Sequence, residues 1–330
     1  MNHDFRSYMH KEIRSAARRP PLHVLAAIFS LALFSPVQTI AADLKPETIQ
    51  AWNEYVRAAE ARNLKHVSEG NLFLAIDALP AEAAKLRRGD IIASPAASNV
   101  PVKVPSGLIH DWTGAIFIPN ATLHDVLQVV RDYEKYETVY HPNVVSAKPL
   151  ETSDWEDRFS MVVMNKSFFA KSALDGDYHS TFTQIDDQRW YTVSETTRIQ
   201  EVVEYGGPSP HMLPEDHGTG IIWRLYSITR YQERDGGVYV ELEAIALSRD
   251  IPGGLRWLVE PIVRRVSRSS LVASLQETAD AVHAGANITS RSPENPRCSA
   301  AKCAVAVTVN GTAARSSGNP RAFAGKGTRP

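Results

Sequence analysis

The feature that most constrains the fold is a run of β-rich segments that ends in one long amphipathic helix. After Pro252-Gly253-Gly254, apolar residues return at helical spacing from Leu255 to about His283. A sheet built from so many strands must bury one of its faces, and this helix is the one element long enough to cover it. The six β-rich segments, with no helical pattern between them, are Asn143–Leu150, Asp157–Asn165, Ala173–Ile185, Arg189–Val203, Gly220–Arg234 and Val238–Ser248.

The rest of the chain adds elements around that sheet. A strand over Leu108–Ile118 precedes one or two short helices within Thr122–Tyr140. Further upstream, Lys45–Asn63 has the apolar stripe of a helix. We therefore expect an α+β fold of the helix-grip kind: a seven-stranded, mostly antiparallel sheet curved around a long C-terminal helix, with two short helices after the first strand and an N-terminal helical extension. That extension is expected to hold short strands at Leu72–Ile76 and Asp90–Ser94 and a turn of helix at Ala81–Leu86.

The long helix has a stripe of apolar residues that we expect to be buried. The register of this stripe breaks near Ser267–Ser270, and Pro261 removes a backbone donor inside the helix, so a kink is expected. The members of the stripe are Leu255, Val259, Ile262, Val266, Leu271, Leu275, Thr278 and Val282.

Residues 1–42 have the composition of an export signal. Arg14, Arg18 and Arg19 precede the apolar run Leu22–Phe34, and small residues follow at Thr39–Ala42. The run is short for a membrane span, so cleavage is expected near Ala41 or Ala42; an uncleaved membrane anchor is the alternative. The sequence thus predicts a periplasmic or secreted protein.

The mature chain divides into three parts. Residues 43–106 form the helical extension and a linker, and residues 107–285 form the main domain. Residues 286–330 have too little apolar content for a packed core and are expected to be a disordered, basic tail. Both cysteines, Cys298 and Cys303, lie in that tail and could form a small disulfide loop.

Charge and motifs exclude several function classes. Residues 43–285 hold 24 basic and 34 acidic residues, which gives no electrostatic footprint for nucleic acid. There is no Gly-x-Ser-x-Gly motif and no glycine-rich phosphate loop. The segment Pro210–Gly218 contains potential metal ligands, but glycines flank it, which indicates a mobile loop rather than a rigid metal site. No metal and no cofactor are therefore expected.

Several stretches resemble a known family. They are "GLIHDWTGAIFIP" (Gly107–Pro119), "VLQVVRDYEKYETVYHPNVV" (Val126–Val145), "TTRIQEV" (Thr196–Val202), "WRLYSITRYQERDGGVYVELEAIALSRDIPGGL" (Trp223–Leu255) and "RSSL" (Arg268–Leu271). On these the chain resembles the START-like (SRPBCC; Bet v 1-like, polyketide cyclase/dehydrase-like) superfamily, and within it a group of exported bacterial members. The resemblance implies a deep, mostly apolar cavity between the sheet and the last helix, which in the superfamily holds lipids, sterols or polyketides.

The two faces of the last predicted strand, Val238–Ser248, differ in polarity, and only one of them can line that cavity. Val240, Leu242 and Ala244 share one face, which should line the cavity, and Glu241 and Glu243 share the other. On that other face the glutamates could pair with Arg224 or Arg230 of the neighbouring strand. The alternative reverses the faces and buries Glu243 near Arg224 or Arg198 as a polar ligand anchor.

The sequence therefore predicts an exported, monomeric binding protein for a lipid or other hydrophobic small molecule, with at most transient membrane contact. Its predicted ligand-binding residues are Val240, Leu242, Ala244, Ile262, Val266, Leu271 and Leu275, with Arg224 and Glu243 as the polar anchor. One alternative is a cyclase- or hydratase-like enzyme that uses Glu243 or His110 as acid or base. Another is an envelope chaperone or interaction module that presents the Trp52/Val56 stripe to a partner.

Overall fold

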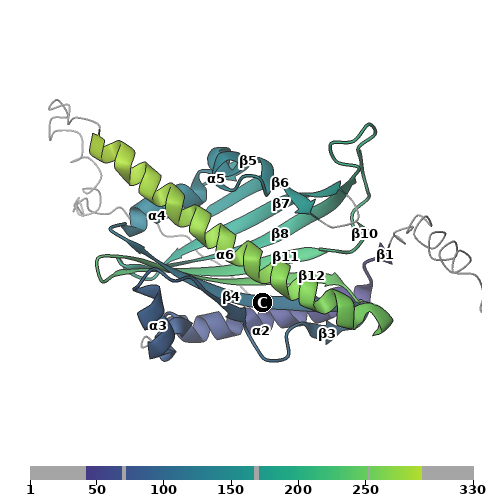
Figure 1. Ribbon diagram of the computed structural model, residues 1–330, viewed down its shortest axis with the longest axis horizontal. Coiled ribbons are helices and arrows are strands. Elements are labelled where there is room, and N and C mark those ends of the chain that lie inside the picture. Colours follow the sequence, from purple (N-terminus) through teal and green to yellow (C-terminus); the bar gives the residue numbers. More distant parts are fainter. Residues whose placement is uncertain (1–41, 69–71, 167–170, 252, 292–330) are drawn as a thin grey trace, which may run out of the picture. The chain divides into compact units, whose positions relative to one another are not determined.

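The computed structural model describes residues 42–68, 72–166, 171–251 and 253–291 (Figure 1). The predicted export signal up to residue 41 and the tail from residue 292, including both cysteines, lie outside the described residues. By its contacts the chain divides into two units, residues 1–284 and 285–330, and the account below concerns the first.

All seven strands predicted for the main domain are present in one antiparallel sheet. The first of them, β4 (Gly107–Pro119), pairs with the last, β12 (Gly237–Arg249), so the first and last of the seven strands lie side by side near one edge of the sheet. The order continues through β11 (Arg224–Arg234), β8 (Arg189–Val203), β7 (Lys171–Gln184), β6 (Glu156–Lys166) and β5 (Val144–Thr152). Three short strands extend it: β2 (Ile92–Pro95), β3 (Val102–Val104) and β9 (His211–Met212).

A long C-terminal helix, α6 (Gly253–Arg291), crosses one face of this sheet diagonally (Figure 1). Leu271, Leu275 and Val282 are buried against the strands. At the crossing a Cβ on Gly114 would lie 2.9 Å from side-chain carbons of both leucines, so a glycine there allows the helix to approach the sheet closely. This arrangement confirms the helix-grip fold expected from the order of strands and helices.

Two shorter helices cover the end of the same face. The first, α4 (Leu123–Arg131), begins with a capping box in which the Thr122 hydroxyl accepts from the amide of Asp125 and the Asp125 carboxylate accepts from the amide of Thr122. A 3₁₀ turn, η2 (Tyr133–Lys135), leads into α5 (Tyr136–Val139). These elements place three tyrosines beside the sheet.

The opposite face of the sheet is covered by the N-terminal extension. Trp52 and Ala59 of α2 (Pro46–Ser68) pack against Ile228 of β11 and Ile245 of β12. The turn η1 (Ala75–Ala78) and α3 (Pro80–Leu86) continue this layer, so the sheet lies between two helical layers. The Trp52 stripe therefore faces the protein's own sheet and not a partner.

One predicted strand is wrong. Leu72–Ile76 forms no strand, because the amides of Ala75 and Ile76 donate to the carboxylate of Glu241, at 3.1 and 2.9 Å, and not to a neighbouring backbone. With both amides bound to one side chain, the segment turns into η1. The short β2 and α3 agree with the other expectations for this region.

Candidate functional site

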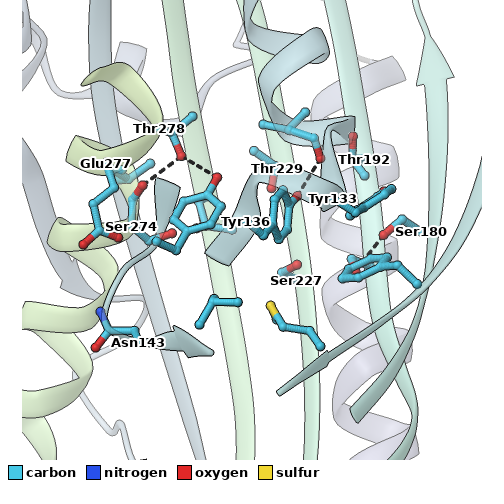
Figure 2. Close-up of a pocket in the computed structure, with 18 of the residues that line it drawn as sticks. Tyr133, Tyr136, Asn143, Ser180, Thr192, Ser227, Thr229, Ser274, Glu277 and Thr278 are labelled. Atoms are coloured by element: carbon cyan, nitrogen blue, oxygen red, sulfur yellow. Dashed lines mark hydrogen bonds between the residues drawn. The ribbon is translucent and has the colours of Figure 1, made fainter. Parts of the chain in front are cut away.

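A cavity of about 410 Å³ lies between the sheet, the α4–α5 segment and the middle of α6. This volume falls in the range of small-molecule pockets. Figure 2 shows side chains from the sheet, the tyrosine segment and α6 converging on it.

The floor of the cavity carries hydroxyl groups in two rows across adjacent strands. Ser180 of β7, Ser194 of β8 and Ser227 of β11 lie opposite one another, and Ser180 donates to Ser194 at 2.8 Å. In the second row, Thr192 of β8 lies opposite Thr229 of β11. Residues two apart on a strand point to the same face, so Ser and Thr at these positions necessarily face the cavity together (Figure 2).

One wall of the cavity is aromatic. Tyr133 stacks on Phe159 with ring centroids 4.1 Å apart, and Tyr136 meets Tyr140 edge-on at 4.9 Å. Burial raises the pKa of Tyr133, Tyr136 and Tyr140 above the usual value, so these phenols stay protonated and neutral at physiological pH. Flat, uncharged side chains of this kind bind rings and alkyl groups.

The helix α6 closes the cavity with polar as well as apolar groups. The hydroxyls of Tyr140 and Thr278 are hydrogen-bonded at 3.0 Å, and Thr278 also donates to the carbonyl oxygen of Ser274 at 2.8 Å (Figure 2). Ser270, Ser274 and Leu275 add to the lining from the same helix. The bond between Tyr140 and Thr278 therefore joins the tyrosine segment to α6 across the cavity.

The lining carries almost no charge. Among its described residues there is no lysine, arginine or histidine, and Glu277 is the one carboxylate. A ligand that enters with a full negative charge would meet no cation to balance it. Hydroxyl and phenol groups, in contrast, can both donate and accept.

Of the predicted apolar lining residues, Val240, Leu242 and Leu275 line the cavity. Leu271 is buried beside it with Trp112 and Val100, and Ala244 packs on the same cluster. The prediction is wrong for Ile262 and Val266, whose side chains are 45% and 54% exposed. The step of five residues from Val266 to Leu271 moves the apolar stripe to another side of the helix, so the two halves of α6 cannot both face the sheet.

The predicted polar anchor is also wrong. Glu243 lies on the sheet face opposite the cavity, where Arg62 Nη2 of α2 donates to its Oε1 at 2.8 Å. Arg224 does not reach it and pairs with Asp216, at 2.8 Å, while Arg198 binds Asp175 and Asp177. The alternation of apolar and acidic residues along β12 therefore predicted the correct face for each side chain. The alternative, in which Glu243 faces the cavity, is wrong.

The outer face nevertheless differs from the expectation for a solvated surface. Arg230 and Glu241 are buried, with 2.9 Å between Nη1 and Oε1, and Asn63 of α2 accepts from Arg230 Nε, also at 2.9 Å. Tyr55 donates to Asp111 Oδ2 at 2.8 Å, and Asp111 Oδ1 is buried without a hydrogen-bond partner among the described residues. Burial, followed by the nearby Glu243, raises the pKa of Asp111 to about 6.

His110 occupies the α6 side of β4 but is not part of the cavity lining. Its Nε2 lies 3.0 Å from Ser248 Oγ, and burial lowers its pKa to about 4, so the imidazole is neutral. The Gly206–Gly218 loop is held by β9 against β8 and by β10 (His217–Gly218) against β1 (Ala42–Asp43). In the described part of the chain no cluster of three metal-ligating side chains occurs.

Sequence reasoning missed the hydroxyl rows and the tyrosine wall. A signal was present: Thr192 and Ser194, like Ser227 and Thr229, alternate with residues of the outer face within strands that were correctly predicted. Polar residues at these positions on the cavity face interrupt the apolar pattern of a core strand.

Comparison with known proteins gives likeness of fold alone. Neither a protein-family model nor a curated protein matches the chain. Among solved structures it is similar to a fragment of the STAR-related lipid transfer protein from Xanthomonas axonopodis, at 18% identity over 58% of this chain and 98% of that one, with a TM-score of 0.38. Human STARD10 is 8% identical over 58% of this chain and 75% of that one, with a TM-score of 0.38. The Zhui aromatase/cyclase from Streptomyces sp. R1128 is 12% identical over 56% of this chain and 97% of that one, with a TM-score of 0.32. The helix-grip assignment rests on the strand order and the packing of α6, and no functional statement is drawn from these likenesses.

Proposed function

We propose that this protein is an exported binding protein that holds a hydrophobic small molecule in the cavity between the sheet and α6. The single observation that carries this proposal is the 410 Å³ cavity with an aromatic wall and a floor of hydroxyl groups. Burial of a ligand's apolar surface would supply the affinity, and the hydroxyls would orient it. Export rests on the composition of residues 1–42.

The lining further favours a ligand whose polar groups are uncharged. Ser194, Ser227 and Thr229 offer donors and acceptors at spaced positions along the floor, and the described lining residues include no cation. An ionised carboxylate or phosphate buried there would lose its hydration without gaining a partner. A lipid or ring compound that bears hydroxyl or carbonyl oxygens fits this lining better than a fatty acid does.

The test is native mass spectrometry with organic extraction on protein purified from the envelope of its own source. A stoichiometric neutral lipid or ring compound is the expected result. A protein that is purified empty and takes up neither a fluorescent sterol nor a fluorescent fatty acid would overturn the proposal. Uptake of the fatty acid in preference to the sterol would contradict the uncharged-ligand part alone.

The alternatives have less support from the geometry. The two residues considered as acid or base, Glu243 and His110, lie outside the cavity lining, one of them on the far face of the sheet. The apolar stripe of α2 that a partner would need is buried against β11 and β12. No described residue thus favours either alternative over ligand binding.

A further inference from the structure

The buried charges on the outer face of the sheet do not balance. Asp111, Glu241 and Glu243 are all buried there. Arg230 lies 2.9 Å from Glu241 and 3.9 Å from Glu243. Arg62 of α2 lies 2.8 Å from Glu243 and 3.5 Å from Asp111. Among the described residues no further cation pairs with these three carboxylates, so their full ionisation would leave one negative charge largely out of water.

Asp111 is the least satisfied of the three carboxylates. Glu241 accepts from two backbone amides as well as from Arg230, and Glu243 contacts both guanidinium groups. Asp111 accepts from the Tyr55 hydroxyl at 2.8 Å through Oδ2, whereas its buried Oδ1 has no hydrogen-bond partner among the described residues. The surplus negative charge is therefore most readily removed by a proton on Asp111.

The helix α2 covers Asp111. Tyr55 and Arg62 both belong to α2, and Ile109, two residues before Asp111 on the same face of β4, lies in the buried cluster that holds the apolar side of this helix. The titratable and charged groups that face Asp111 are Tyr55 and Arg62 from α2 and Glu243 from β12. If α2 moved off the sheet, the Asp111 carboxylate would return to water.

We propose that protonation of Asp111 and docking of α2 on the sheet are coupled, so that α2 is held most tightly while Asp111 is neutral and loosens as Asp111 ionises. An ionised Asp111 has lost its hydration under the docked helix and regains it when the helix leaves. The coupling is reciprocal: α2 raises the proton affinity of Asp111 by the same factor by which the proton raises the affinity of the sheet for α2. This coupling goes beyond the proposed ligand binding and does not depend on it.

The direction and size of the effect follow from the titration of Asp111. Burial, followed by the nearby Glu243, raises the pKa of Asp111 to about 6. With α2 undocked the pKa returns to the ordinary value of an aspartate, so the favourable contribution to docking is lost as the pH rises through 6. Between pH 5 and pH 7 the equilibrium constant for opening of α2 should increase about tenfold.

The position of α2 allows it to open separately from the sheet. The strands pair with one another and not with α2, which is held to them by side chains. No described helix, α2 included, is long and apolar enough to cross a membrane. An element held in this way opens at a lower free energy than the paired strands do.

The test is hydrogen–deuterium exchange of the full chain at pH 5, 6 and 7, with exchange rates divided by the intrinsic rates at each pH. Amides of α2 should be less protected than those of β7, and their protection in wild type should fall about tenfold from pH 5 to pH 7. In Asp111→Asn, which keeps an oxygen for the Tyr55 hydroxyl, the protection of α2 should be the same at pH 5 and pH 7.

Asp157→Asn is the matched control. Asp157 is as fully buried as Asp111 and pairs with Arg131, but it lies on β6 beneath α4 and away from α2. This variant should keep the pH dependence of α2. Should Asp111→Asn lose its fold by circular dichroism, Tyr55→Phe replaces it: loss of the hydroxyl that donates to Asp111 should move the fall in protection to higher pH.

Three results would overturn the inference. One is protection of α2 that stays constant from pH 5 to pH 7 in wild type, or that falls equally in Asp111→Asn. Another is loss of the pH dependence in Asp157→Asn, because the effect would then not belong to the charges under α2. The third is equal protection of α2 and β7 at every pH, which would mean that the helix opens only when the whole sheet unfolds. Ligand uptake in the cavity is measured separately, so failure here leaves the proposed function standing.

Discussion

The two faces of the sheet hold their polar groups in opposite ways. On the face toward α6 the strands present Ser and Thr hydroxyls to an open volume, with almost no charge nearby. On the face toward α2, β12 carries Glu241 and Glu243 and β11 carries Arg230, and these side chains are buried and paired under a helical layer. Both faces are polar where a plain core would be apolar.

The difference indicates which polar groups belong to the structure and which to a ligand. On the outer face the polar groups form hydrogen bonds with other groups of the protein: the Glu241 carboxylate accepts from the amides of Ala75 and Ile76 and from the Arg230 guanidinium. Such a network positions the N-terminal extension on the sheet, because each charge needs its partner. On the cavity face the groups are neutral, so each can tolerate water or exchange it for a ligand oxygen.

The largest effect is expected for Arg230→Met. This change leaves Glu241 and Glu243 buried without their strand partner, which should lower the free energy of unfolding by about 3–5 kcal/mol. Urea denaturation would measure it. The control is Arg224→Met, whose half-buried pair with Asp216 should be worth about 1 kcal/mol or less. Equal losses in the two variants would show that the outer network is no more than surface pairing.

His110 and Asp111, neighbours on β4 that point to opposite faces, should give opposite pH dependences. For His110 the folded pKa, about 4, lies below the unfolded one, so its contribution to stability is present above pH 6.5 and is lost as the pH falls toward 4. The difference in unfolding free energy between wild type and His110→Gln should change by about 3 kcal/mol over that window. A flat difference would mean that His110 is solvated in the folded state.

For Asp111 the folded pKa, about 6, lies above the unfolded one, so its favourable contribution is present below about pH 4 and is lost as the pH rises to 6. Asp111→Asn keeps an oxygen for the Tyr55 hydroxyl and removes the charge, so at pH 7 it should be more stable than wild type by about 1–3 kcal/mol. Denaturation at several pH values between 4 and 7 checks this. A variant less stable than wild type at pH 7 would mean that Arg62, whose Nη2 lies 3.5 Å from Asp111 Oδ2, compensates the carboxylate charge fully.

The smallest effect on stability, but a direct one on binding, is expected for Ser194→Val/Ser227→Val. Loss of two neutral hydrogen-bonding groups should weaken binding of an oxygenated ligand by roughly tenfold and change stability little. Titration with the extracted ligand, followed by tryptophan fluorescence, measures it. Ser146→Val, at an exposed position of β5, is the control and should bind as wild type does.

Much of the fold could be predicted because it follows from local pattern. Alternation identified seven strands and the correct face for Val240 and Leu242, and helical spacing identified α6. The site was predicted less well. Ile262 and Val266 have the spacing of a buried stripe, but spacing alone does not say which side of a helix meets the sheet once the register has broken.

By itself the sequence determined the elements, their order and which residues share a face, because these depend on the two- and 3.6-residue periods of neighbouring side chains. The tertiary structure decided what each face meets. Glu243 lies under α2 and not in water, and the Ser and Thr rows come together through pairing of β7, β8 and β11. Those contacts join residues that are far apart in the chain, and no local period carries information about them.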